Sequence, residues 1–202
     1  MKNNVLPLAL YSNPGVKAII RAEDSCILYK RLTGDLREQE KISTSHCMTF
    51  VAKGTVQVKT YEGHCVTAGE NELLFMPQDT YTISDLILDD DAIEVFLVFF
   101  DQEIAMDFLR ATGMKRYPTH AESRAICKLN TGSTVPQYFT ALKEMYLSID
   151  SAPHLLKIKI LEFLHLVHRD NPRLILSTLT ASDVQKRRRS IETIMLNNYD
   201  SA

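Results

Sequence analysis

The fold is decided by the stretch SHCMTFVAKGTVQVKTYEGHCVTAGENELLFMPQDTYTIS, residues Ser45–Ser84. Its apolar residues form short runs, and several of these alternate with polar residues, as in a strand that buries one face. Turn-forming residues separate the runs at Gly54, Gly63, Gly69 and Pro77. This rhythm predicts a small antiparallel β-barrel.

The strand pattern extends in both directions from this stretch and covers the first half of the chain. About eight strands are expected, which is enough to close or nearly close a barrel. The segment Leu32–Lys41 is polar and charged, and is expected to be a loop or a solvated edge. The expected strands are Val16–Ile20, Cys26–Lys30, Cys47–Val51, Thr55–Lys59, His64–Val66, Leu73–Met76, Tyr81–Ser84 and Ile93–Phe100.

After Phe100 the apolar residues recur at helical spacing. We expect a first helix that is capped by Asp101 and ended by Gly113, and a second that begins near Pro136. The segment Lys115–Thr134 between them is expected to be an irregular connection. The second helix should bury one stripe, which consists of Tyr138, Leu142, Met145 and Ile149.

A third helix is expected from Pro153 to the Asn171-Pro172 pair. Its apolar arc is wider than burial on one side requires, so it needs cover from the barrel and the second helix, or from a second subunit as well. We predict that it forms a homodimer interface. If its main stripe is core, the flank should make the contact; the candidate dimerisation residues are Leu155, Leu156, Lys159, Phe163 and Leu166.

The composition is that of an ordinary globular chain, and it narrows the function. The net charge of −2 provides no general attraction to nucleic acid or to an acidic membrane surface. The four cysteines contain no CxxC pair, so reduced, mostly buried thiols are expected. The longest apolar run, Val95–Phe100, has the length of a strand, and no signal peptide or membrane span is evident. The sequence predicts a cytoplasmic protein without a membrane partner.

The histidines do not form a metal-ligand pattern. A metal-binding barrel of the cupin type needs two His separated by one residue, a carboxylate and a later His. Neither His46 nor His64 has this partner, and QDTY stands at Gln78–Tyr81, where the later His would lie. On the third helix, His165 and His168 share a solvated arc with charged residues. We therefore predict that the protein binds no metal and no other cofactor.

Catalytic motifs are missing from the sequence too. It has no GxSxG, and its glycines are isolated, so no phosphate-binding loop is formed. The neighbours His46 and Cys47, like His64 and Cys65, lie on strands, where adjacent side chains point to opposite faces and cannot act on each other. The sequence predicts no catalytic residues and no enzyme activity.

The last segment, Ser177–Ala202, contains the basic run Lys186, Arg187, Arg188, Arg189 in an expected helix that also has an apolar face. Such a run is commonly one charged face of a helix. It also fits the first helix of a DNA-binding domain. In that case this sequence would contain only the start of the domain. Because base readout requires a helix seated in the major groove, we expect no DNA-binding residues within this chain.

Three segments in this order resemble the AraC/XylS family of bacterial transcription factors, and within it the ExsA-like regulators of virulence and type III secretion genes. The segments are ELLFMPQDTYTIS at 72–84, PHLLKIKILEFLHLV at 153–167 and RRRSIETIMLNNYD at 187–200. The resemblance implies a cupin-like domain followed by helices that dimerises and receives a signal. It also implies a carboxy-terminal domain with two helix-turn-helix units that binds promoter DNA.

The fold class expected from these observations is therefore α+β, a cupin-like antiparallel β-barrel followed by helices that pack on it. The expected domains are the barrel at 1–100, a helical dimerisation region at 101–176, and a linker with the start of a truncated helix-turn-helix domain at 177–202. The barrel strands offer mainly Val, Phe, Leu, Met and Thr, which favours control by an apolar ligand or by a regulatory protein. The alternative is a metal-free cupin-like small-molecule binding protein or isomerase.

Overall fold

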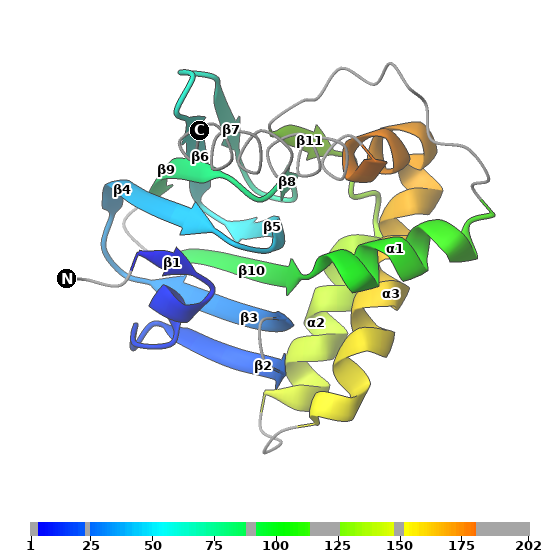
Figure 1. Cartoon of the computed structure of the whole chain (residues 1–202). Helices are drawn as coiled ribbons and strands as arrows, with labels where there is room; N and C mark the ends of the chain where they lie inside the picture. Colours follow the sequence, from blue (N-terminus) through cyan, green and yellow to red (C-terminus); the bar gives the residue numbers. More distant parts are fainter. Residues whose placement is uncertain (1–3, 23–24, 88–91, 114–125, 148–151, 181–202) are drawn as a thin grey trace, which may run out of the picture.

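The structure is a computed structural model that describes residues 4–22, 25–87, 92–113, 126–147 and 152–180. Two β-sheets face each other, and helices cover the outer face of one of them (Figure 1). This arrangement confirms the expected α+β class with a cupin-like β-structure followed by helices. Between described residues the two sheets are separate, so the barrel is not closed.

The first sheet has five strands in the order β1-β4-β9-β6-β7. All its pairs are antiparallel except β1 with β4, which run parallel over two residue pairs. The strands are β1 (Val5–Leu6), β4 (Leu36–Ser43), β9 (Thr80–Leu86), β6 (Thr55–Thr60) and β7 (Cys65–Ala68). The short 3₁₀ helix η1 (Leu8–Leu10) follows β1.

The second sheet has six strands in the order β11-β8-β5-β10-β3-β2, and all its pairs are antiparallel. Its strands are β11 (Cys127–Leu129), β8 (Leu73–Met76), β5 (His46–Lys53), β10 (Ile93–Phe100), β3 (Ser25–Leu32) and β2 (Val16–Ala22). Strand β10 lies between β3 and β5 and is buried along almost its whole length. It is the apolar run that the sequence identified as a strand.

The strands of the sequence analysis are confirmed, and the structure adds three. The polar segment Leu32–Lys41 contains most of β4, whose outward residues are exposed, so the strand shows little apolar alternation. The expected irregular connection Lys115–Thr134 contains β11, which pairs with β8 over three residues. Strand β1 has only two residues. Strands this short or this polar carry too few apolar residues to be recognised from periodicity.

Three helices follow the strands as expected: α1 (Gln102–Ala111), α2 (Thr134–Tyr146) and α3 (Pro153–Asp170). The Asp101 side chain caps α1 by accepting a hydrogen bond of 2.9 Å from the backbone N–H of Ile104. One expectation for α2 is wrong, because Met145 is 50% exposed and not part of a buried stripe. Its predicted neighbour Ile149 lies outside the described residues.

Residues 172–180 form a further helix that the sequence analysis did not predict. Pro172 follows the end of α3 and occupies the first position of this helix, where proline is well tolerated. Asn171 fixes the junction, because its side-chain amide donates to the carbonyl oxygens of Asn130 and Val167 at 2.7 and 3.0 Å. Ile175 and Leu179 of the new helix are buried in the core.

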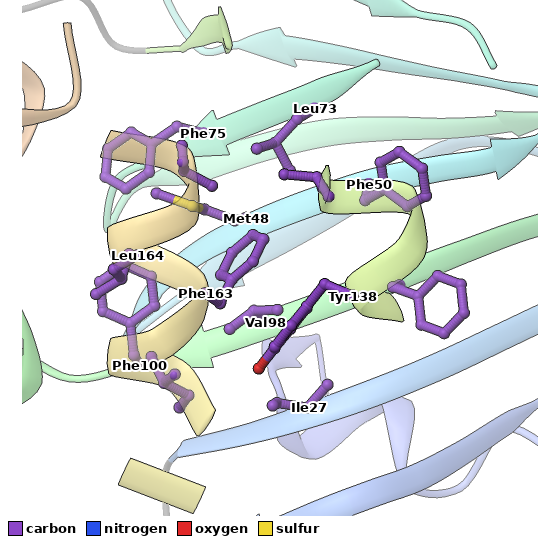
Figure 2. Close-up of a cluster of buried hydrophobic side chains, with 14 of the residues drawn as sticks. Ile27, Met48, Phe50, Leu73, Phe75, Val98, Phe100, Tyr138, Phe163 and Leu164 are labelled. Atoms are coloured by element: carbon purple, nitrogen blue, oxygen red, sulfur yellow. The ribbon is translucent and has the colours of Figure 1, made fainter. Parts of the chain in front are cut away.

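The six-stranded sheet lies between two apolar clusters, because alternate residues of its strands point to opposite faces. One face carries Met48, Phe50 and Phe75 and packs against the helices (Figure 2). Phe139 of α2 stacks there on Phe96, with ring centroids 4.7 Å apart, and on Phe50 at 5.2 Å. The other face points toward the five-stranded sheet and forms a second cluster with its inward residues; that cluster includes Cys47, Val56, Leu97 and Phe99.

Candidate functional site: the cavity between the sheets

A cavity of about 500 Å³ lies between the two sheets. The six-stranded sheet contributes mainly apolar residues, and the five-stranded sheet contributes both apolar and charged ones. The amino-terminal segment that contains β1 and η1 lines it as well, through Leu6, Ala9 and Leu10 among others. The volume is in the range of pockets that hold small molecules. From the two sheets the lining includes Cys47, Thr49, Met76, Leu97, Phe99, Val56 and Ile83.

An irregularity in β4 shapes one wall of this cavity. The register of β4 against β9 shifts between Leu36 and Gln39. Within this bulge Glu38 has a φ of +50°, and its backbone N–H donates to Ser84 Oγ at 3.0 Å. A bulge changes the side on which the following residues lie. As a result Leu36, Gln39 and Lys41 all line the cavity, although simple alternation would not place Leu36 and Gln39 on one face.

A buried ion pair spans the cavity from one sheet to the other. Lys30 Nζ of β3 lies 2.7 Å from both Oδ1 and Oδ2 of Asp85 on β9. The two side chains are only 8% and 6% exposed. A lysine ammonium that contacts both carboxylate oxygens is well compensated, whereas either charge alone at this position would be costly. Sequence reasoning noted Lys30 only as a strand end and did not identify Asp85.

Cys47, whose thiol lines the cavity, is not an activated nucleophile. Burial raises the pKa of Cys47 to about 12, although the Thr49 hydroxyl beside it acts in the opposite direction. Cys26, on the same face of the sheet, has its pKa raised to about 12 by burial as well. Thiols with such pKa values remain protonated at neutral pH, and the thiolate is the reactive form. Both residues act as small apolar groups there.

The histidines lie elsewhere. His46 is buried on the helix side of β5, between Phe75 and Phe100, with its Nε2 3.0 Å from Gln102 Oε1. His64 is exposed in the turn before β7. His165 and His168 of α3 both meet the ring of Phe108, with centroids at 5.0 and 5.8 Å. In the part of the chain that the structure describes, no three His, Cys, Asp or Glu side chains converge to hold a metal ion.

The predicted dimerisation residues divide into two groups. Leu156 and Phe163 are buried within the chain itself and belong to the core. Leu155, Lys159 and Leu166 are partly buried on the flank of α3. The carbonyl of Lys159 accepts a 2.6 Å hydrogen bond from the Tyr138 hydroxyl, which places this flank against α2. Leu166 packs against the same core.

The most exposed apolar residue of α3 is Ile158, at 60%, which the sequence analysis missed. A helical projection was sufficient to find it, because it lies opposite the stripe of buried residues. It stands between Lys157 and Lys159 in the sequence.

Two further sequence features concern the basic run and the question of a membrane span. The basic run Lys186–Arg189 lies outside the described residues. Among the helices of the described ranges, none combines the length and apolarity that crossing a membrane requires.

Comparison with known proteins identifies a family and a fold. The model of the ExsA N-terminal regulatory domain matches residues 46–177. Apo ToxT K231A from Vibrio cholerae is similar in structure, with a TM-score of 0.52 and 12% identity over 74% of this chain and 58% of that one. The chain thus spans less than two thirds of the ToxT chain it matches. No curated protein sequence matches the chain.

Two further solved structures are more distant. ToxT from Vibrio cholerae O395 bound to (E)-4-(8-methylnaphthalen-1-yl)but-3-enoic acid has a TM-score of 0.45 and 11% identity over 70% of this chain and 57% of that one. An RmlC-like cupin with a double-stranded β-helix fold from Methanocaldococcus jannaschii has a TM-score of 0.36 and 16% identity over 43% of this chain and 78% of that one.

Proposed function

Because this chain belongs to the family of the ExsA N-terminal regulatory domain, we propose that its cavity receives the signal that controls an AraC-type transcriptional activator. Membership confirms the resemblance that the sequence showed, and the chain is a regulatory domain of this type. Promoter binding belongs, in this proposal, to a carboxy-terminal domain outside the chain. Virulence or type III secretion genes are the proposed targets.

The observation that carries this proposal is the cavity of about 500 Å³ between the sheets. A core that only stabilises the fold is normally packed without voids of this size. The apolar lining from Leu97, Phe99 and Met76 suits a small apolar effector. Control by a regulatory protein is the alternative, and it does not require the cavity to be filled.

The proposal includes no catalysis. The thiol of Cys47 is kept protonated by burial, and His46 lies on the opposite side of the sheet from the cavity. Neither group is therefore available in the cavity for nucleophilic attack or proton transfer, and the apolar lining suits binding.

Occupation of the cavity can be tested with the neutral apolar dye N-phenyl-1-naphthylamine. We expect saturable fluorescence enhancement by the wild-type chain. Val56→Phe, which places a ring into the cavity, should weaken binding at least about tenfold while circular dichroism stays unchanged. Met145→Phe on the surface of α2 is the control and should bind as the wild type does. Equal binding by all three chains would show that the dye sits elsewhere and would favour protein control.

We propose further that the chain forms a homodimer through the exposed side of α3. Ile158 is the residue that best supports this, because it is large, apolar and 60% exposed next to the partly buried Leu155. Leu156 and Phe163 are buried, so their contribution to the dimer would be indirect: they pack in the core that supports α3. A symmetric interface would use this helix face twice.

Light scattering and sedimentation test the dimer. Ile158→Asp should yield a folded monomer, because a carboxylate would be buried without a partner in the interface. Ile42→Asp introduces the same charge at a residue that is 45% exposed on β4, away from the helices, and should leave the dimer intact. A dimer that survives Ile158→Asp would place the interface elsewhere.

A further inference from the structure

The cavity contains a cation whose charge is already satisfied. Lys30 is held by both oxygens of Asp85 at 2.7 Å, and both side chains line the cavity. Around Asp85 the five-stranded sheet presents Leu36 and Val56, its partners in register on β4 and β6. The carboxylate therefore gains its compensation mainly from the lysine and not from a polar surrounding.

We infer that Asp85 determines the charge specificity of this cavity: its carboxylate reserves Lys30, so that the cavity accepts uncharged apolar ligands and rejects anionic ones. The inference rests on the proposed function of the cavity as an effector site and names the class of that effector.

The reason is electrostatic. An anionic ligand that approached Lys30 would bring a second negative charge beside Asp85 in a region shielded from water, and like charges there disfavour each other strongly. A cationic ligand would face the same difficulty with Lys30. An uncharged ligand leaves the ion pair intact and buries its apolar surface against Leu97 and Phe99.

The remaining polar groups of the lining do not alter this selection. Cys47 is uncharged because its thiol stays protonated. Lys41 also lines the cavity and forms no ion pair with any described residue, but it is partly exposed, so water shares its charge. The other polar residues of the lining are neutral and are compatible with a hydroxyl or amide on the ligand; they are Asn4, Ser12, Asn13, Gln39 and Thr49.

Removing the carboxylate should convert the cavity into an anion site. In Asp85→Asn the side chain keeps its shape but the ammonium of Lys30 loses its counter-ion, so a ligand carboxylate in the cavity can then supply the missing negative charge. Charge-assisted hydrogen bonds to a shielded ammonium are among the stronger polar contacts in proteins. The gain should require Lys30, so it should be absent from the double variant Lys30→Met/Asp85→Asn.

The test uses 4-phenylbutanamide and 4-phenylbutanoate, which have the same shape and differ in charge. Binding of each to the whole chain is measured by calorimetry at pH 7.5. We expect the wild type to prefer the amide, and Asp85→Asn to bind the carboxylate at least about tenfold more tightly than the wild type does. Glu72→Gln, which removes the Lys128–Glu72 pair at the surface, is the matched control and should change neither affinity.

If Asp85→Asn is too unstable for calorimetry, the shift of its melting temperature with each compound gives the same comparison. The preference of the wild type for the amide or the carboxylate tests the inference independently of this variant. Wild-type binding of the carboxylate as tight as that of the amide would overturn the inference while leaving the cavity as a ligand site. So would an Asp85→Asn variant without any gain for the carboxylate. Binding of neither compound to any variant would overturn the ligand cavity itself.

Discussion

The two faces of the six-stranded sheet are built from alternate residues of the same strands, but one is densely packed and the other borders a cavity. The helix face is filled by aromatic rings: Phe139 stacks on Phe50 and Phe96. Figure 2 shows Phe50, Phe75 and Phe100 on this face. The face toward the five-stranded sheet borders the cavity and the Lys30–Asp85 pair. One sheet thus separates a densely packed core from a region that contains open space.

If the cavity receives an effector, as proposed, this division separates the residues that bind it from those that hold the fold together. A ligand that enters between the sheets contacts residues such as Cys47 and Leu97, whose strand neighbours Met48 and Phe96 are held by the helices. Because interiors are densely packed, such neighbours restrain each other. Changes on the helix face should therefore affect stability most, and changes on the cavity face should affect binding most.

The largest effect is expected from Phe139→Ala. The ring is fully buried and also lies 5.1 Å from that of Phe163, centroid to centroid, so its removal leaves a cavity in the middle of the helix face. The free energy of unfolding should fall by about 3–5 kcal/mol in urea denaturation. Met145→Ala on the exposed side of the same helix should change it by less than about 0.5 kcal/mol. A similar small loss for both variants would contradict the dense packing of this face.

A matched pair of valines tests the difference between the faces directly. Val98→Leu adds a methylene to the packed helix face and should lower the free energy of unfolding by about 1–3 kcal/mol. Val56→Leu adds the same group next to the cavity, where space is available, and should cost less than about 1 kcal/mol. Both residues lie on strands, so the lower strand preference of leucine affects them alike. An equal loss of the free energy of unfolding in both variants would show that the cavity has no room for the added methylene at Val56.

How far the sequence predicted these two faces depends on the length of the pattern. The apolar runs of β5 and β10 were long enough to identify the strands. The main apolar stripe of α3 is buried; it consists of Leu156, Ile160, Phe163, Leu164 and Val167. The cavity was not predictable in the same way. Its lining depends on a register shift around Glu38 within a polar strand, and it includes a pair, Lys30 and Asp85, that is 55 residues apart. Periodicity carries no information about contacts at that separation.

The smallest effect is expected at the edge of the helix face, where Glu94 of β10 links the sheet to α2. Its Oε2 accepts a 2.6 Å hydrogen bond from the Tyr29 hydroxyl and lies 3.6 Å from Lys143 Nζ, while Arg31 Nε is 3.3 Å from Oε1. Burial by itself raises the pKa of Glu94, but the Tyr29 hydroxyl and the two cations outweigh it and hold the pKa below its ordinary value. The carboxylate is therefore favoured in the folded state.

A lowered pKa in the folded chain means that this stabilisation is present above the pKa of the unfolded chain, about 4.3, and is lost as the pH falls through the lower folded value. Glu94→Gln should thus lower the free energy of unfolding at pH 7 by no more than about 1 kcal/mol, because the group is partly exposed. The difference from the wild type should shrink below about pH 4. Glu40→Gln is the control, since Glu40 is exposed on β4 and forms no ion pair with a described residue. A deficit of Glu94→Gln that is the same at pH 3.5 and pH 7 would assign the contribution of Glu94 to packing, because the charge of its carboxylate would then have no effect on how α2 is held to the sheet.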